Sequence, residues 1–205
     1  MWRFCDRAAA FGRVVHLTLL NQGVRMTVSM KLFSRAAALL LLASSLACAR
    51  AVTRPDGGVG MLAVGATAPD LVGVDGTGKT TRLSELRGHA AVVYFYPKDG
   101  TPGCTKEACA FRDAWERYAR AGVTIFGVSN DSAEKHQKFI AEHHLPFPLV
   151  SDESGDLARA WGVSTGLFGF SRVSFLVGAD GRIAKIWPDV DPGVHATEVL
   201  AAAAP

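Results

Sequence analysis

Apolar and polar positions follow two different periods from about residue 64 onward. Short runs of β-forming residues predict strands, and the clearest is the unbroken apolar run at 91–96, which is typical of a strand buried on both faces. Further strands are predicted at 123–128 and 148–151. Apolar residues three or four positions apart predict helices at about 104–120, 132–143 and 195–203. Strands that alternate with helices indicate an α/β fold, with a central mixed sheet flanked by helices.

Turn-forming residues predict two hairpins within this pattern. An extended stretch at 68–74 leads into a Gly-rich turn at 75–79, and strands at 174–177 and 182–187 flank a second turn. Glycine accepts the positive φ that tight turns need. We find no internal repeat, so we expect one domain over residues 64–205.

The N-terminal segment reads differently. Residues 31–50 hold two cations followed by fourteen uncharged, mostly apolar residues before Arg50. That length suits the apolar core of an export signal and is shorter than the ~18 residues of a membrane span. We expect an N-terminal extension at 1–49 that contains an export signal, and the signal would start at Met26 or Met30. The protein would then be located in the periplasm or the cell envelope. The alternative is an uncleaved extension on a cytoplasmic protein.

The end of this signal raises the question of lipidation. Ala47 and Ala49 supply the small side chains of an export cleavage site. Cys48 also stands where a lipobox has its cysteine, but Ser45 replaces the branched aliphatic residue of that motif. We therefore favour simple export over lipidation, and expect a membrane contact only if Cys48 is lipidated. Pro and Gly without periodicity predict a linker at 50–63.

The net charge of the folded part does not favour a nucleic-acid partner when residues 1–61 are counted separately. The whole chain carries a formal charge of +3. Residues 1–61 hold 8 Lys or Arg and 2 Asp or Glu, and residues 62–205 hold 14 and 17, so the folded part carries 14 − 17 = −3. We expect no nucleic-acid partner.

The segment 73–80 matches the G-x-x-x-x-G-K-[ST] pattern of a phosphate-binding loop. Such a loop needs a substantial helix behind it, whose backbone N–H groups face the phosphates. Only residues 81–87 remain before Gly88 and the next strand. We therefore interpret the segment as a hairpin turn rather than a nucleotide site.

The six histidines do not predict a metal site. None pairs with a cysteine or a second histidine at the spacing of a closed zinc site. The adjacent His143 and His144 end a predicted helix, where a cation is favourable, so capping is the preferred interpretation. We expect no metal and no cofactor.

Two cysteines, Cys104 and Cys109, fall in the folded part. Residues 97–104 run from the end of a buried strand, through a Pro/Gly loop, into a helix that is predicted to start at about Cys104. A sulfur at a helix start meets unpaired backbone N–H groups and the positive end of the helix dipole, which favours the thiolate. Cys104 is therefore a candidate nucleophile, and the hydroxyl of Thr101 can donate to an oxyanion or a peroxide oxygen.

A static disulfide between the two cysteines conflicts with an intact helix. Five residues of ideal helix separate the Cα atoms by about 8.6 Å, whereas a disulfide needs roughly 4.4–6.8 Å. Oxidation would have to unwind the first turns, so a reversible dithiol switch is favoured over a structural bridge.

These residues resemble a known family. Pro97-x-x-x-Thr101-x-x-Cys104 is similar to the active-site signature of peroxiredoxins, and Cys109 is similar to the resolving cysteine of the peroxiredoxin Q, or bacterioferritin comigratory protein, subgroup. The resemblance continues to about Leu200, through segments 111–113, 127–129, 145–152, 161–163 and 172–177. It implies a thioredoxin-like fold and the reduction of hydrogen peroxide or alkyl hydroperoxides.

The resemblance also implies roles for individual residues. Cys104 attacks the peroxide and becomes a sulfenic acid, and Cys109 then condenses with it. Thr101, the backbone N–H of Cys104 and Arg172, at the family's catalytic arginine, hold the peroxide oxygens. Pro97 shields the pocket, and a thioredoxin-like donor reduces the disulfide.

Several alternatives stay open. Glu107 either orients Arg172 or is a favourable anion near the helix start. A copper-delivery module of thioredoxin-like fold would need a histidine over the pocket, and residues 162–172 offer none. Thiol–disulfide exchange on protein substrates would not use Thr101 or Arg172. We expect a monomer or a weak dimer.

Overall fold

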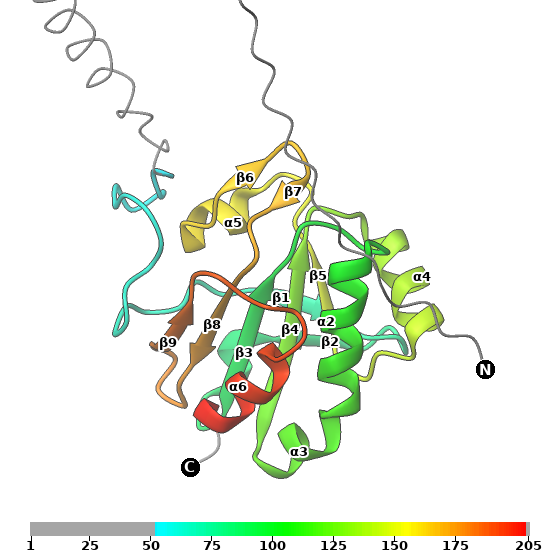
Figure 1. The fold of residues 1–205 in the computed structure, drawn as a ribbon. Coiled ribbons are helices and arrows are strands. Elements are labelled where there is room, and N and C mark those ends of the chain that lie inside the picture. Colours follow the sequence, from blue (N-terminus) through cyan, green and yellow to red (C-terminus); the bar gives the residue numbers. More distant parts are fainter. Residues whose placement is uncertain (1–51, 204–205) are drawn as a thin grey trace, which may run out of the picture. The chain divides into compact units, whose positions relative to one another are not determined.

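Seven strands form one mixed sheet in the order β2-β1-β5-β4-β3-β8-β9, as the computed structural model shows for residues 52–203 (Figure 1). The strands are β1 Val72–Val74, β2 Thr80–Arg82, β3 Ala90–Phe95, β4 Val123–Ser129, β5 Leu149–Ser151, β8 Val173–Val177 and β9 Ile183–Trp187. A separate short hairpin joins β6 Thr165–Gly166 to β7 Gly169–Phe170.

The strand β3 lies near the centre of the sheet. It pairs in parallel with β4 and antiparallel with β8, with Phe95 opposite both Val128 and Val173. All but the first of its six residues are buried. An unbroken apolar strand is expected where both faces of a sheet are covered.

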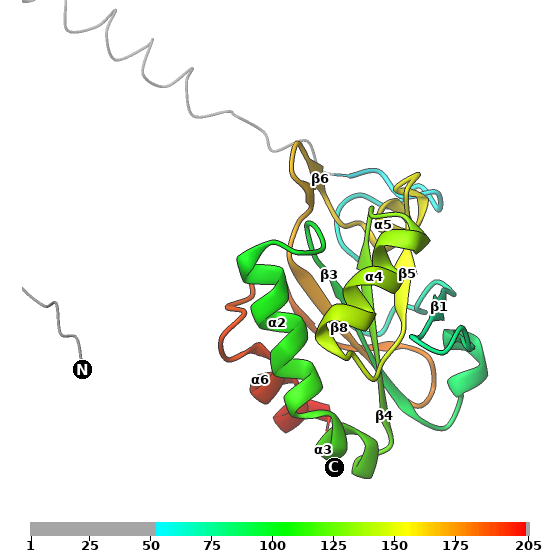
Figure 2. The same ribbon diagram turned by 90° about the vertical axis from the view of Figure 1, so that its right-hand side faces the viewer.

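The two faces of β3 belong to two separate cores. Val92, Tyr94 and Tyr96 point to the first core, and the alternate residues of the strand point to the second. The first core is covered by α2 Pro102–Asp113, α3 Trp115–Arg120, α4 Ala133–His143 and α6 His195–Ala203. The second core is covered by the 3₁₀ helix η1 Leu83–Leu86 and by α5 Asp156–Trp161. Both ribbon views place α2 and α6 side by side on the first face (Figures 1 and 2).

Most predicted elements are confirmed. The strands, the helices at 132–143 and 195–203, and the hairpin of β8 and β9 appear where they are expected. The phosphate-loop match is a hairpin turn between β1 and β2, closed by the Asp75 N–H donating to the Lys79 carbonyl at 3.0 Å. The backbone there does not lead from a strand into an α-helix.

One predicted helix needs correction, and two elements were not predicted. The helix predicted at 104–120 is two helices, because the backbone at Ala114 (ψ 0°) ends α2 and starts α3. The helix α5 and the hairpin β6–β7 were not predicted. Within the predicted linker at 50–63, Leu62 is buried and its N–H donates to the Trp161 carbonyl.

The predicted extension and export signal at 1–49 and Cys48 lie outside the described residues. Within residues 52–203, no helix is long and apolar enough to cross a membrane.

Candidate active site

The start of α2 presents Cys104 to the core. Thr101 is extended (φ −77°, ψ 146°) and caps the helix, and its carbonyl accepts the first helical hydrogen bond from Thr105. Pro102 takes the first helical position, which suits proline because its missing N–H would have no partner there. Cys104 follows two residues later and is 1% exposed. Its sulfur therefore lies in the first turn, among the backbone N–H groups that α2 leaves unpaired.

Arg172 reaches Cys104 across the sheet. Because Phe95 of β3 pairs with Val173 of β8, the residue before β8 lies beside the loop that leaves β3 for α2. The Arg172 Nη2 lies 3.2 Å from the Cys104 Sγ. A guanidinium at this distance is a charge-assisted donor to a thiolate. The sheet register thus brings together two residues that are 68 positions apart.

Glu107 holds the other side of the guanidinium. Arg172 Nη1 donates to Glu107 Oε2, and Glu107 is fully buried one turn after Cys104. Burial lowers the pKa of Arg172, but the Glu107 carboxylate and the Cys104 sulfur raise it more, so the balance lies above the ordinary value. Of the two roles left open for Glu107, contact with Arg172 is the one observed.

His195, the first residue of α6, contacts the second oxygen of the same carboxylate. Its Nδ1 lies 2.8 Å from Glu107 Oε1. The imidazole is 1% exposed and packs edge-on with Phe111 and Trp187, at centroid distances of 5.2 and 6.1 Å. Its Nε2 is buried without a hydrogen-bond partner in the part of the chain that the structure describes. Cys104, Arg172, Glu107 and His195 therefore form a continuous row.

The loop before α2 carries Pro97 and Thr101. The Thr101 hydroxyl donates to the Lys98 carbonyl at 3.2 Å. Pro97 is half-buried, and its carbonyl oxygen lies close to Gly169 of the hairpin β6–β7. A Cβ on Gly169 (φ +113°) would lie 2.0 Å from that oxygen. Only glycine fits this close approach, so the hairpin packs directly on the loop.

A buried polar network fixes the same loop from the other side. Asp99 accepts a hydrogen bond from the Tyr96 hydroxyl at 2.6 Å and lies 2.7 Å from His136 Nδ1. The Asp99 backbone N–H donates to Asp131 at 2.8 Å. A fully connected network of this kind makes the backbone between β3 and α2 rigid.

Tyr94 lies under the site. Its ring stacks on Phe111 at 4.9 Å, and its hydroxyl is buried without a partner among residues 52–203. Burial, then the charges of Glu107 and Asp99, raise the pKa of Tyr94 well above its ordinary value. The phenol is therefore neutral at physiological pH.

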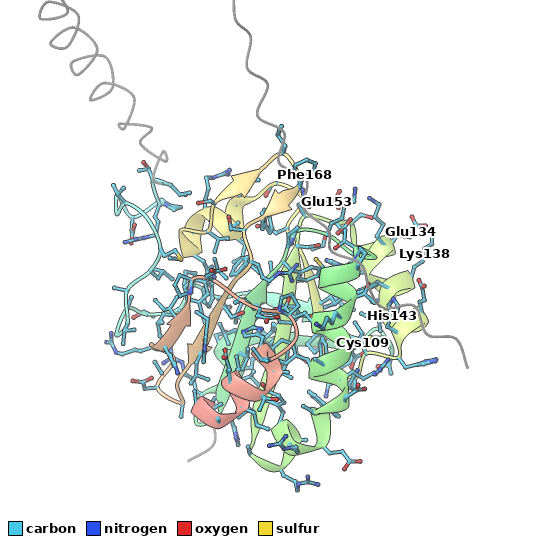
Figure 3. The ribbon with its side chains drawn as sticks, in the orientation of Figure 1. Cys109, Glu134, Lys138, His143, Glu153 and Phe168 are labelled. Carbon is cyan, nitrogen blue, oxygen red and sulfur yellow. The ribbon has the colours of Figure 1, made fainter. Side chains whose placement is uncertain are left out.

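Cys109 lies in the same helix as Cys104 and is half-buried; Figure 3 labels it on α2. Both cysteines are free thiols. Next to Cys109 on the helix surface, Arg112 Nη1 donates to the His143 carbonyl at 2.9 Å and links α2 to α4. The two sulfurs therefore belong to one intact helix in the reduced protein.

The structure thus brings Cys104 into direct contact with Arg172 and places Pro97 and Thr101 in the adjoining loop. His195 and Tyr94 were not predicted from the sequence, because each meets the site through long-range packing. A buried histidine on the apolar face of the last helix, with Ala196, Val199 and Leu200, was the available signal. The described residues contain no group of three or more metal-ligating side chains.

The sequence matches the AhpC/TSA family model over residues 64–186. Peroxiredoxin Bcp of Bacillus subtilis is 44% identical over 144 residues, which cover 67% of this chain and 92% of that protein. The chloroplastic peroxiredoxin Q of Sedum lineare is 40% identical over 139 residues, which cover 66% of this chain and 75% of that protein.

Solved structures agree with these relatives. Peroxiredoxin Q of Xanthomonas campestris superposes with a TM-score of 0.60 at 38% identity, covering 65% of this chain and 89% of that one. A structure of the Xanthomonas campestris bacterioferritin comigratory protein, solved to study its alkyl peroxide reduction activity, gives a TM-score of 0.60 at 37% identity, covering 65% and 89%.

Proposed function

The chain belongs to the AhpC/TSA family, in its Bcp/peroxiredoxin Q subgroup, and is a peroxidase of thioredoxin-like fold; from this premise we propose that Cys104 is its peroxide-reducing cysteine and Cys109 its resolving cysteine. The observation that carries the assignment is the 3.2 Å contact between Arg172 and the Cys104 sulfur at the start of α2. Among the described residues the Cys109 sulfur accepts no such hydrogen bond, and its neighbouring cation, Arg112, instead donates to Asp113 and to the His143 carbonyl.

In the first step, the Cys104 thiolate attacks the terminal oxygen of the peroxide. The S–O bond forms as the O–O bond breaks, the leaving oxygen takes a proton, and water or an alcohol departs. Cys104 is oxidised to a sulfenic acid and the peroxide is reduced. Arg172 and the backbone N–H of Cys104 stabilise the negative charge as it moves onto the leaving oxygen. The Thr101 hydroxyl joins them by turning its proton from the Lys98 carbonyl to the peroxide. Pro97 shields the reacting sulfur from water.

In the second step, the Cys109 thiol condenses with the sulfenic acid. The new S–S bond forms, water leaves, and the start of α2 unwinds, because about 8.6 Å of ideal helix separates the two Cα atoms. An external dithiol of the thioredoxin class then attacks the disulfide through a mixed disulfide and returns both cysteines to thiols.

We propose hydrogen peroxide and alkyl hydroperoxides as substrates, because the Xanthomonas campestris relative was studied for alkyl peroxide reduction. We also propose that the enzyme is exported, on the strength of the apolar segment before Arg50. Its donor is then a dithiol protein of the cell envelope rather than the cytoplasmic thioredoxin pool.

Peroxide consumption by the full chain tests this proposal. The experiment supplies hydrogen peroxide or cumene hydroperoxide, with thioredoxin and its reductase as one reductant and dithiothreitol as another. We expect turnover with both peroxides, and no turnover for Cys104→Ser. Peroxide loss that persists in Cys104→Ser would contradict the assignment of Cys104. Turnover that dithiothreitol supports and thioredoxin does not would contradict a donor of the thioredoxin class.

A further inference from the structure

We propose that His195 is a positioning residue for peroxide reduction. It holds the Glu107 carboxylate, which in turn keeps Arg172 on the Cys104 sulfur. The inference rests on the proposed function of Cys104. It concerns the first residue of α6, which does not itself contact the reacting sulfur. His195 meets Glu107 across 88 positions of sequence.

The argument begins with the carboxylate of Glu107. Each of its oxygens has one donor: Oε2 accepts from Arg172, and Oε1 lies 2.8 Å from His195 Nδ1. A carboxylate accepts hydrogen bonds, so the proton of this contact resides on Nδ1. Glu107 is 0% exposed, and a buried carboxylate oxygen that loses its donor is costly.

Arg172 is the group that would respond to such a loss. Its Nη1 already contacts Glu107, and its Nη2 contacts the Cys104 Sγ. If Oε1 loses its donor, the carboxylate gains most by turning both oxygens toward the guanidinium in a bidentate pair. That movement withdraws Nη2 from the sulfur. The contact at His195 therefore decides how the charge of Arg172 is shared between Glu107 and Cys104.

Packing alone does not account for a histidine at this position. The imidazole lies between Phe111 and Trp187 at 1% exposure, and its Nε2 has no partner within residues 52–203. An apolar side chain would fill the same space without burying an unpaired nitrogen. The single hydrogen bond to Glu107 is the feature that an apolar residue cannot supply.

The same contact opposes the second step of the reaction. Glu107 lies between Cys104 and Cys109, in the part of α2 that must unwind before the disulfide forms. His195 is held on the body of the protein by its own helix, whose Ala196 carbonyl accepts a 2.6 Å hydrogen bond from the Tyr118 hydroxyl. Unwinding therefore breaks the contact between Glu107 and His195. Loss of His195 should slow peroxide attack and speed disulfide formation.

Stopped-flow kinetics of three variants of the full chain test the inference. His195→Leu fills the space without a donor, His195→Asn keeps a donor at a position close to Nδ1, and Val199→Ala removes buried volume from α6 without removing a hydrogen bond of Glu107. For His195→Leu we expect peroxide attack about 10- to 100-fold slower, as for a small misplacement of a reacting group, and faster disulfide formation. His195→Asn should recover most of the attack rate, and Val199→Ala should lower the melting temperature with an unchanged attack rate.

Two outcomes would overturn the inference while leaving the proposed function intact: an attack rate in His195→Leu within twofold of the parent chain, or an equal loss of attack rate in Val199→Ala. A parent chain that does not react with peroxide at all would instead contradict the proposed function.

A measurement on the parent chain covers the case in which His195→Leu does not fold. Nitrogen-15 NMR of the histidine side chains should show His195 Nδ1 bonded to a proton in the reduced protein, and this signal should change on disulfide formation. An unprotonated Nδ1 in the reduced protein would overturn the inference.

Discussion

Two sources of positive potential meet at the sulfur of Cys104. The first is the start of α2, where backbone N–H groups have no helical partner. The second is the guanidinium of Arg172, which is partly buried and therefore poorly screened by solvent. Only the second source can be removed by one substitution that leaves the helix in place.

Arg172→Met should slow peroxide attack by about 10²–10³, which is the usual cost of losing one preorganised donor. The rate constant of the single-turnover reaction measures this. Arg159→Met is the matched control, because Arg159 lies on α5 and pairs only with Asp156 among its described contacts. A near-normal rate in Arg172→Met would mean that the helix start alone activates the sulfur.

Spacing along the chain pointed to the candidate site residues that follow one another in the loop and helix, Arg172 came from the family resemblance alone, and His195 was missed. Pro97, Thr101 and Cys104 lie within one short segment, so their spacing is visible in the chain. Glu107 had two interpretations in the sequence, and its contact with Arg172 favours the one in which it orients that guanidinium. His195 joins the site through α6, which no local spacing reveals.

The helix α2 has two differently anchored halves. Its first turns are held by the buried residues Cys104, Glu107 and Ala108, and two of these three contact Arg172. Its second half is held by Phe111, whose ring packs against Tyr94, Tyr118 and Phe147. The first half can therefore unwind while the aromatic anchor remains in place.

Disulfide formation should raise the rate of amide hydrogen exchange at the start of α2. An ideal helix separates the two Cα atoms by about 8.6 Å, so the disulfide form cannot keep these turns. Mass-detected exchange of the reduced and oxidised proteins measures this, and the hairpin of β8 and β9 is the internal control. Equal protection at residues 101–111 in both states, with the disulfide verified by mass, would contradict the switch.

Elements with a long, regular pattern were predictable, whereas β6, β7 and α5 were not. The two strands of the β6–β7 hairpin have two residues each, which is too short for an alternation to be seen. The helix α5 has six residues between Gly155 and Gly162, both left-handed at φ 70°. The break at Ala114 has neither glycine nor proline, so nothing in the local sequence marks it.

Across the whole molecule, the tyrosines report on the integrity of the first core. The chain has three, Tyr94, Tyr96 and Tyr118, and all are buried on the face covered by α2 and α6. Burial is the first cause that raises the pKa of each phenol above its ordinary value, and nearby carboxylates add to it for Tyr94 and Tyr96. The folded protein therefore keeps phenolic protons that the unfolded chain releases.

Stability should fall as the pH rises above about 10, the ordinary pKa of tyrosine. Each phenol has a folded pKa above its unfolded value, so above pH 10 the folded state binds more protons and the free energy of unfolding decreases with pH. Absorbance of the phenolate and circular dichroism, followed together, should change in one step. Phenolate that forms near pH 10 with an unchanged dichroism spectrum would contradict this burial.

The division of labour between the two cysteines is tested most directly by the mass of each variant after one equivalent of peroxide. Cys109→Ser should gain one oxygen atom at Cys104, which a sulfenic-acid reagent then traps, because attack does not need the resolving thiol. Cys104→Ser should stay unmodified under the same conditions, because the sulfur held by Arg172 is missing. Oxidation of Cys109 in Cys104→Ser, at the rate seen for Cys104 in the parent chain, would contradict the account.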